Sequence, residues 1–251
     1  YGTVKMRTIN KDNPMDISES SIVCNPLDID TSYTDYSYVT TACEILSNGD
    51  YIVIADLRKS SSICGQYGVY VFKSSNKGLT WTRKIITFTD GTELTTTTFG
   101  IYGLKQSDTG RLHCCHYSNA GLLMYYSDDL GETWNKVQVT NNSGYSNDKV
   151  KWGAGIAVLG DNKIIVYQRI VDSTKPVGLC ITKSEDDGNT WSGLTESKTL
   201  QDCANTPPAV IVHNGMVELC YGTRYIRSNE GHPRIYYTNC TINDAWNDNY
   251  K

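Results

Sequence analysis

Short apolar runs recur along most of this chain, and polar turn residues separate the runs. Typical runs are Tyr51–Ile54 and Leu112–Cys114, and turn pairs such as Asn48-Gly49 precede them. Short apolar runs bounded by turn residues predict strands, and Asn-Gly between two such runs predicts a tight hairpin. Long stretches with helical periodicity are missing, so we expect an all-β protein.

A short motif repeats along the chain with a period of about 55 residues. It has the pattern Ser-x-Asp/Asn-x-Gly-x-Thr-Trp and occurs at Ser74–Trp81, Ser127–Trp134 and Ser184–Trp191. A longer, frayed fourth copy runs from Thr238 to Trp246. A hairpin and a strand-like run precede each copy, so one repeat predicts four antiparallel strands. Tandem four-stranded units pack radially, which predicts a β-propeller.

The repeats predict a single domain over residues 1–251. The repeat boundaries fall at about 37–97, 98–150, 151–203 and 204–251. The first 36 residues hold two more strand-like pieces, Val4–Ile9 and Ser20–Cys24, and we expect one of them to close the ring as the outer strand of the last blade. About five blades follow, with four blades or an incomplete ring of six as alternatives.

The motif predicts a structural turn. Ser and Asp side chains bond back onto local backbone groups, Gly accepts a positive φ, and Trp supplies a large apolar anchor. We therefore interpret its acidic residues as turn formers, with no catalytic or metal-binding role.

Composition and charge exclude several classes of function. Basic residues number 23 and acidic residues 27, and the net charge of −4 argues against a nucleic-acid-binding surface. No apolar run is long enough to span a membrane, so we expect no membrane insertion. The nine cysteines include no C-x-x-C pair, which argues against a zinc ribbon. Cysteines within apolar runs are interpreted as small buried side chains: Cys43, Cys114, Cys180 and Cys220.

Two histidines flank a cysteine pair and raise the question of a metal site. Alternation sends His113 and Cys115 to one face of their strand and Cys114 and His116 to the other. The sequence therefore predicts a structural role for these residues, and we expect neither a metal nor a cofactor.

The repeated motif resembles the Asp-box, or BNR, repeat, and the chain is similar to sialidases and their β-propeller relatives. The resemblance extends to Tyr38–Arg58, where Asn48-Gly49 and Ala55-Asp56-Leu57-Arg58 match the first sialidase repeat. It implies that Arg58 and Arg224 match family arginines. Arginine suits such a role because its planar fork binds a carboxylate through two N–H groups.

The sequence departs from the sialidase pattern at three places that the resemblance marks as functional. Val39 stands where the first arginine of the carboxylate-binding triad is expected, with Thr40-Thr41 in place of Ile-Pro. Lys59–Lys73 holds no carboxylate where the family has its general acid. Asn205 or Thr206 occupies the position of the glutamate that activates the nucleophile, and Asn is no base at neutral pH.

These departures favour a protein that binds carbohydrate without cleaving it. The ends of the second strands in successive repeats predict a ligand-binding rim with Asp56, Arg58, Arg169 and Arg224, and Trp152 is a candidate platform for a sugar ring. A glycoside hydrolase with relocated carboxylates is the alternative, and a purely structural propeller is the third reading. The start at Tyr1 shows no signal peptide, so we expect an excised piece of a phage tail or surface-adhesion protein that acts on the virion or outside the cell.

Overall fold

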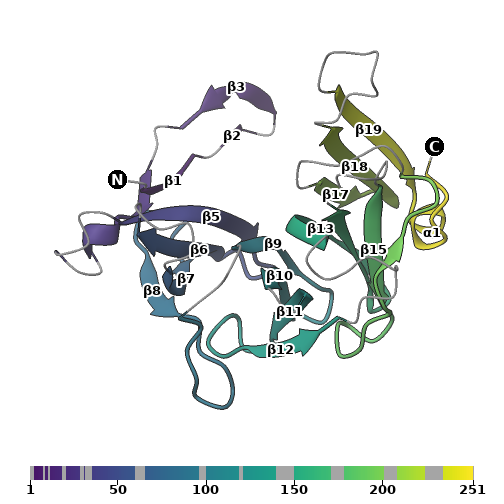
Figure 1. The fold of residues 1–251 in the computed structure, drawn as a ribbon. Coiled ribbons are helices and arrows are strands. Elements are labelled where there is room, and N and C mark those ends of the chain that lie inside the picture. The colour runs from purple at the N-terminus through teal and green to yellow at the C-terminus, as the bar shows by residue number, and fades with distance from the viewer. Residues whose placement is uncertain are drawn as a thin grey trace. The chain divides into compact units, whose positions relative to one another are not determined.

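A computed structural model describes residues 3–7, 9–10, 12–18, 21–28, 31, 36–59, 66–95, 100–118, 121–139, 150–170, 178–200, 208–223 and 234–250. The chain divides into two compact units, Tyr1–Thr97 and Thr98–Lys251 (Figure 1). Each unit is a set of antiparallel sheets, and the helices in the described part of the chain are too short to cross a membrane.

The first unit contains one four-stranded sheet and two short ribbons. The sheet has the order β5-β6-β7-β8, and the ribbons pair β1 with β4 and β2 with β3. The elements are β1 (Val4–Met6), β2 (Ile9–Asn10), β3 (Asn13–Ile17), β4 (Ser21–Cys24), a 3₁₀ turn (Pro26–Asp28), β5 (Tyr36–Ile45), β6 (Tyr51–Lys59), β7 (Gln66–Ser74) and β8 (Thr82–Ile85).

The second unit contains three sheets in sequence order, β9-β10-β11-β12, β13-β14-β15-β16 and β17-β18-β19. Its elements are β9 (Ile101–Gln106), β10 (Leu112–Ser118), β11 (Gly121–Ser127), β12 (Asn135–Gln138), β13 (Val150–Gly160), β14 (Lys163–Ile170), β15 (Leu179–Ser184), β16 (Thr195–Glu196), β17 (Ala209–His213), β18 (Met216–Thr223), β19 (Arg234–Thr241) and α1 (Ile242–Trp246).

Apolar layers between successive sheets hold the second unit together. One layer joins β9–β12 to β13–β16 and includes Cys115, Met124 and Val166. The next joins β13–β16 to β17–β19 and includes Tyr167 and Leu219. Because alternate residues of β14 enter the two layers, this strand is buried on both faces, as the middle sheet of a radial stack requires.

Small residues let the innermost strands of successive sheets approach closely. A Cβ atom on Gly155 of β13 would lie 2.4 Å from Val210 of β17. A Cβ atom on Gly103 of β9 would lie 2.9 Å from Ile156 of β13. Both distances are too short for carbon atoms, so this radial packing depends on glycine at these two positions.

In the first unit, the β1–β4 ribbon packs against one face of the β5–β8 sheet. Val4, Val23 and Cys24 join Leu57 and Phe72 in an apolar cluster, and the Cys24 thiol lies 2.9 Å from the Tyr38 hydroxyl. The expected role of this segment in closing a ring as a single domain remains a prediction.

The three Asp-box turns have the structure that the sequence predicts. In each turn the serine Oγ accepts a hydrogen bond from the glycine N–H at 2.8 Å, and the glycine φ lies between 78° and 89°. The third residue accepts the threonine N–H at 2.8 to 2.9 Å. Trp134 and Trp191 donate through Nε1 to the carbonyl of that glycine.

The predicted fourth box, Thr238–Trp246, is wrong. The β19 strand continues to Thr241, whose hydroxyl then caps α1 by accepting the Asp244 N–H at 3.1 Å. The sequence Asn243-Asp244-Ala245-Trp246 lacks the glycine that takes the positive φ in the other three copies, so a helical turn forms instead.

Two of the four cysteines expected to be buried are exposed. Cys114 and Cys180 lie in the core, whereas Cys43 and Cys220 lie on the opposite, exposed faces of their strands. An apolar run therefore identified the strands correctly, but it did not show which face each thiol would occupy.

Candidate functional site

Asp56 and Arg58, which the sequence places at the ligand-binding rim, form an ion pair on β6. The Arg58 Nε donates to the Asp56 Oδ2 at 2.8 Å, and its Nη2 lies 2.7 Å from the same oxygen. The Asp56 side chain is fully buried and that of Arg58 is 14% exposed. A buried carboxylate thus fixes one edge of a guanidinium group that reaches the surface.

The strand geometry accounts for this pairing. Leu57, between the two charged residues, points into the apolar cluster with Phe72, so Asp56 and Arg58 share the other face of β6. The register of β5 against β6 shifts between Tyr38 and Thr41, which is a bulge beside Asp56. Bulges re-aim side chains at strand ends and are frequent next to binding sites.

The other predicted rim residues cannot be combined with this pair in one site. Trp152 lies in β13 and Arg169 in β14, but their side chains are outside the described residues. Arg224 also lies outside the described residues, as do Asn205 and Thr206. Their roles in binding therefore remain predictions.

The prediction that the two histidines of β10 face opposite ways is confirmed. His113 bonds to Asp187 of the next sheet, and Cys115 enters the same intersheet layer. His116 stacks on Tyr125, and its Nδ1 lies 2.9 Å from the tyrosine hydroxyl. Among the described residues, no group of three His, Cys, Asp or Glu side chains is arranged to hold a metal ion.

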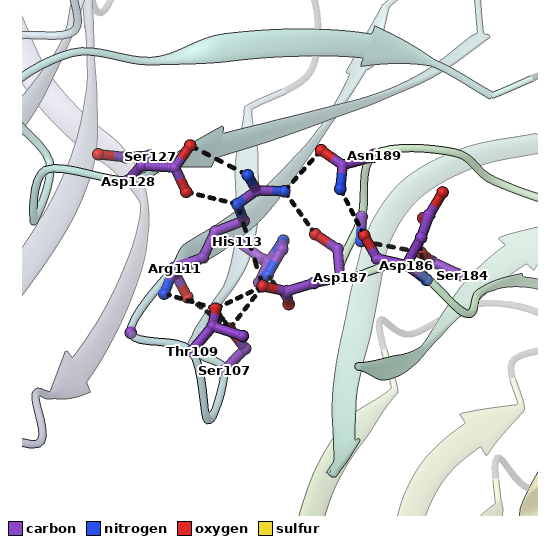
Figure 2. Close-up of polar contacts among 12 residues, drawn as sticks. Ser107, Thr109, Arg111, His113, Ser127, Asp128, Ser184, Asp186, Asp187 and Asn189 are labelled. Atoms are coloured by element: carbon purple, nitrogen blue, oxygen red, sulfur yellow. Dashed lines mark hydrogen bonds and ion pairs between the residues drawn. The ribbon is translucent and has the colours of Figure 1, made fainter. Parts of the chain in front are cut away.

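Asp187 is at the centre of a polar cluster between two sheets of the second unit (Figure 2). Its Oδ1 lies 3.0 Å from Nε2 of His113. Its Oδ2 accepts from the hydroxyl of Thr109 at 2.5 Å and from that of Ser107 at 3.2 Å. Arg111 donates to the Asp187 backbone carbonyl at 2.8 Å, so the cluster joins the β9–β10 hairpin to the third Asp-box.

Arg111 extends the cluster to a second Asp-box. Its Nε and Nη2 donate to the two carboxylate oxygens of Asp128 at 2.6 and 3.0 Å, and its Nη1 donates to Asn189 Oδ1 at 2.8 Å. The guanidinium also lies over the ring of Tyr126. One arginine therefore ties two boxes from adjacent sheets, as Figure 2 shows.

The sequence interpretation missed this role for Asp187. Asp186 is the turn former: it accepts the Thr190 N–H and hydroxyl. Asp187 follows it at φ +52°, where the other boxes have Lys77 and Leu130. The turn itself therefore does not require a carboxylate at this position. The presence of Asp in only one of the three boxes is the sequence feature that indicates a further role for Asp187.

The cluster does not have the order of a nucleophilic triad. In such a triad a histidine stands between the hydroxyl and the carboxylate. Here the carboxylate of Asp187 receives both the hydroxyls and the imidazole, and the described His113 side chain is 1% exposed. This arrangement stabilises the packing of two sheets and does not activate Thr109 or Ser107 as a nucleophile.

These contacts predict a loss of stability in acid. Burial opposes ionisation of Asp187, but hydrogen bonds from His113 and Thr109 lower its pKa to about 2, below the usual 3.8. Its ionised form therefore stabilises the fold above pH 4, and this contribution, about 2 kcal/mol, disappears as the pH falls through 2. Urea unfolding between pH 2 and 4 is expected to show a smaller slope with pH for Asp187→Asn than for the unmodified protein. Equal changes of unfolding free energy with pH in the two proteins would contradict this role of Asp187.

The family of the chain follows from the residues that carry these turns. The family model of the BNR repeat-like domain matches residues 51–230, which include all three Asp-boxes and the Asp56–Arg58 pair. The chain belongs to the BNR repeat-like family. No curated protein matches the chain.

Solved structures support the propeller fold of this BNR repeat-like chain. A Hadza microbial sialidase superimposes with a TM-score of 0.67 and 13% identity, covering 95% of this chain and 50% of that one. A mutant NanB sialidase from Streptococcus pneumoniae gives 0.60 and 13%, with coverages of 91% and 52%. An α-L-arabinanase from Penicillium chrysogenum, complexed with arabinobiose, gives 0.56 and 17%, with coverages of 81% and 64%.

These comparisons confirm the predicted all-β, sialidase-like propeller class. The chain spans only half to about two thirds of the length of these structures. At identities of 13 to 17%, the likeness concerns the fold alone, and the activities of those proteins belong to them.

Proposed function

We propose that this BNR repeat-like chain recognises carbohydrate without cleaving it, and that Arg58 contacts an acidic group of the glycan. The Asp56–Arg58 pair is the observation that carries this proposal. A guanidinium with one edge fixed by a buried carboxylate offers its remaining N–H groups in a preorganised direction. Such a group is suited to the carboxylate of an acidic sugar.

The lack of catalysis rests on the carboxylates near Arg58. Hydrolysis of a glycosidic bond ordinarily requires two carboxyl groups, one of them a proton donor. Asp56 forms an ion pair with Arg58 and is therefore not a proton donor, and Lys59–Lys73 holds no Asp or Glu. A binding module of a phage tail or cell surface remains the setting that the sequence favours.

Glycoside hydrolysis is the second candidate, because the similar solved structures include sialidases and an arabinanase. It requires carboxylates placed elsewhere in the chain. The two functions differ in one observable: a hydrolase shortens the glycan that it binds.

Arg58→Ala is expected to weaken binding to an acidic glycan at least tenfold and also to lower the thermal midpoint of unfolding, because it removes the ion-pair partner of the buried Asp56 carboxylate. The variant removes the guanidinium group that contacts the glycan, and a charge-assisted hydrogen bond contributes about 1.5–3 kcal/mol to binding. Binding is measured by titration calorimetry with the best glycan from an array of sialylated, neutral and bacterial wall sugars.

Arg83→Ala is the matched control, since Arg83 lies on the outer strand β8 and donates to the backbone carbonyl of Asp28. It is expected to bind as the unmodified protein does. Equal affinities for both variants would rule out Arg58 as the ligand contact.

A further inference from the structure

Gln168 has a buried side-chain amide that no described residue satisfies. The residue lies on β14 and is 1% exposed. Neither its Oε1 nor its Nε2 has a hydrogen-bond partner in the part of the chain that the structure describes. A buried polar group without a partner destabilises a fold, and such groups are rare in native proteins.

The described surroundings of the Gln168 amide are apolar. Ile164, Val166 and Gln168 alternate on one face of β14, and the first two enter the apolar layer between β9–β12 and β13–β16. The strand neighbours of Gln168 are Ala154 and Cys180, both members of that layer. The amide therefore lies at the end of an apolar layer, where a Leu or Met would pack without loss.

The strand beside Gln168 is irregular at this point. The register of β13 against β14 shifts between Val150 and Ala154, so that three residues of β13 face one residue of β14. In the first unit, the bulge of β5 occupies the corresponding place in its sheet, beside Asp56. Both sheets thus carry a buried polar side chain on the second strand, next to a bulge of the innermost strand.

We propose that the Gln168 amide is a ligand-binding group, which hydrogen-bonds to sugar hydroxyls of a bound glycan. This inference rests on the proposed carbohydrate-binding function and places a neutral contact in the second unit. A primary amide donates through its NH₂ and accepts through its oxygen. It therefore matches two adjacent hydroxyls of a sugar ring, one as acceptor and one as donor. The low exposure of Gln168 means that the rim must open locally for this contact.

Gln168→Met separates this role from a structural one. Methionine has a similar length and no amide, so it fits an apolar layer. We expect the thermal midpoint to rise by about 2–4 °C, because an unsatisfied buried group is removed. We expect glycan affinity to fall at least tenfold, measured by calorimetry with the glycan selected on the array. This opposite movement of stability and affinity is the signature of a functional residue held at a cost in stability.

Gln106→Met is the matched control. Gln106 is also on a strand of the second unit, but its Nε2 donates to the Gly110 carbonyl at 2.9 Å. This variant is expected to lose a little stability and to keep its affinity. Unchanged affinity in Gln168→Met would overturn the proposal, since the amide would then make no contact with the glycan. A lowered midpoint would overturn it as well, by making the amide structural.

A second measurement does not depend on how the variant folds. The chain has five glutamines, so a protein labelled with [¹⁵N]glutamine gives five side-chain amide pairs. Saturating glycan is expected to shift the Gln168 pair and to leave the Gln106 pair in place. A Gln168 pair that does not move while the glycan binds would overturn this inference and leave the proposed function standing. Absence of binding to every glycan would overturn both.

Discussion

Replacing Asp187 with Ala is expected to lower the free energy of unfolding by about 3–5 kcal/mol, the range found when one partner of a buried polar or ionic cluster is removed. The variant leaves the hydroxyls of Ser107 and Thr109 and the imidazole of His113 without their shared acceptor. Ser107 and His113 are buried between two sheets, where water does not replace the lost carboxylate, whereas Thr109 is exposed. Urea unfolding at pH 7 measures the change.

Asp128→Ala is the matched control for this prediction. Asp128 is also an Asp-box carboxylate, and it also pairs with Arg111, but its side chain is 57% exposed. An exposed ion pair contributes only about 0–1 kcal/mol. Similar losses for the two variants would contradict the view that the intersheet position of Asp187 determines its effect.

Trp134→Ala is expected to cost about 3–5 kcal/mol, as large-to-small substitutions of buried aromatic residues do. Trp134 ends the second Asp-box and is 0% exposed, and its Nε1 donates to the Gly131 carbonyl at 3.2 Å. The variant removes the anchor and leaves that carbonyl without its indole donor. Thermal unfolding by circular dichroism measures the loss.

Trp191 gives the comparison for Trp134. It ends the third box with the same hydrogen bond, to the Gly188 carbonyl at 3.0 Å, but its side chain is only partly buried against the intersheet layer. Trp191→Ala is therefore expected to destabilise the fold by a smaller amount. A larger loss at Trp191 than at Trp134 would show that burial does not set the size of the effect.

The local parts of the fold could be predicted because they depend on nearby residues. The box turns are built from hydrogen bonds between residues two to four positions apart, such as Ser127 with Gly131. The opposite faces of His113 and His116 follow from the period of a strand. Where the glycine was missing, at Asn243–Trp246, the chain formed a helical turn that the resemblance to a box had concealed.

The intersheet contacts could not be predicted, because their partners are far apart in the sequence. Asp187 meets Thr109 across 78 residues, and no local pattern marks this pair. Asp248 shows the same arrangement at the end of the chain: it accepts from Ser197 at 2.5 Å and from the backbone N–H of Lys198 at 2.6 Å. Both aspartates have positive φ values, 52° and 59°, and both receive a Ser-x-Thr segment from another sheet.

The candidate site was predicted in part. The position of Asp56 and Arg58 at the end of a second strand predicts that they lie at the rim, and the structure brings them into contact at 2.7 Å. Gln168 directly precedes Arg169, which the sequence places at the rim, but no sequence pattern indicates that its amide is buried without a partner among the described residues. Among the described residues, the structure thus separates two kinds of buried polar group: those of the Asp187 cluster, which have hydrogen-bond partners, and the Gln168 amide, which has none.

The most direct test of the account is a glycan array in which each spot is analysed by mass spectrometry after incubation with the protein. The account predicts retained protein on intact acidic glycans, with retention lost in Arg58→Ala and kept in Arg83→Ala. Shortened glycans would contradict it and would show that carboxylates outside Lys59–Lys73 carry out hydrolysis.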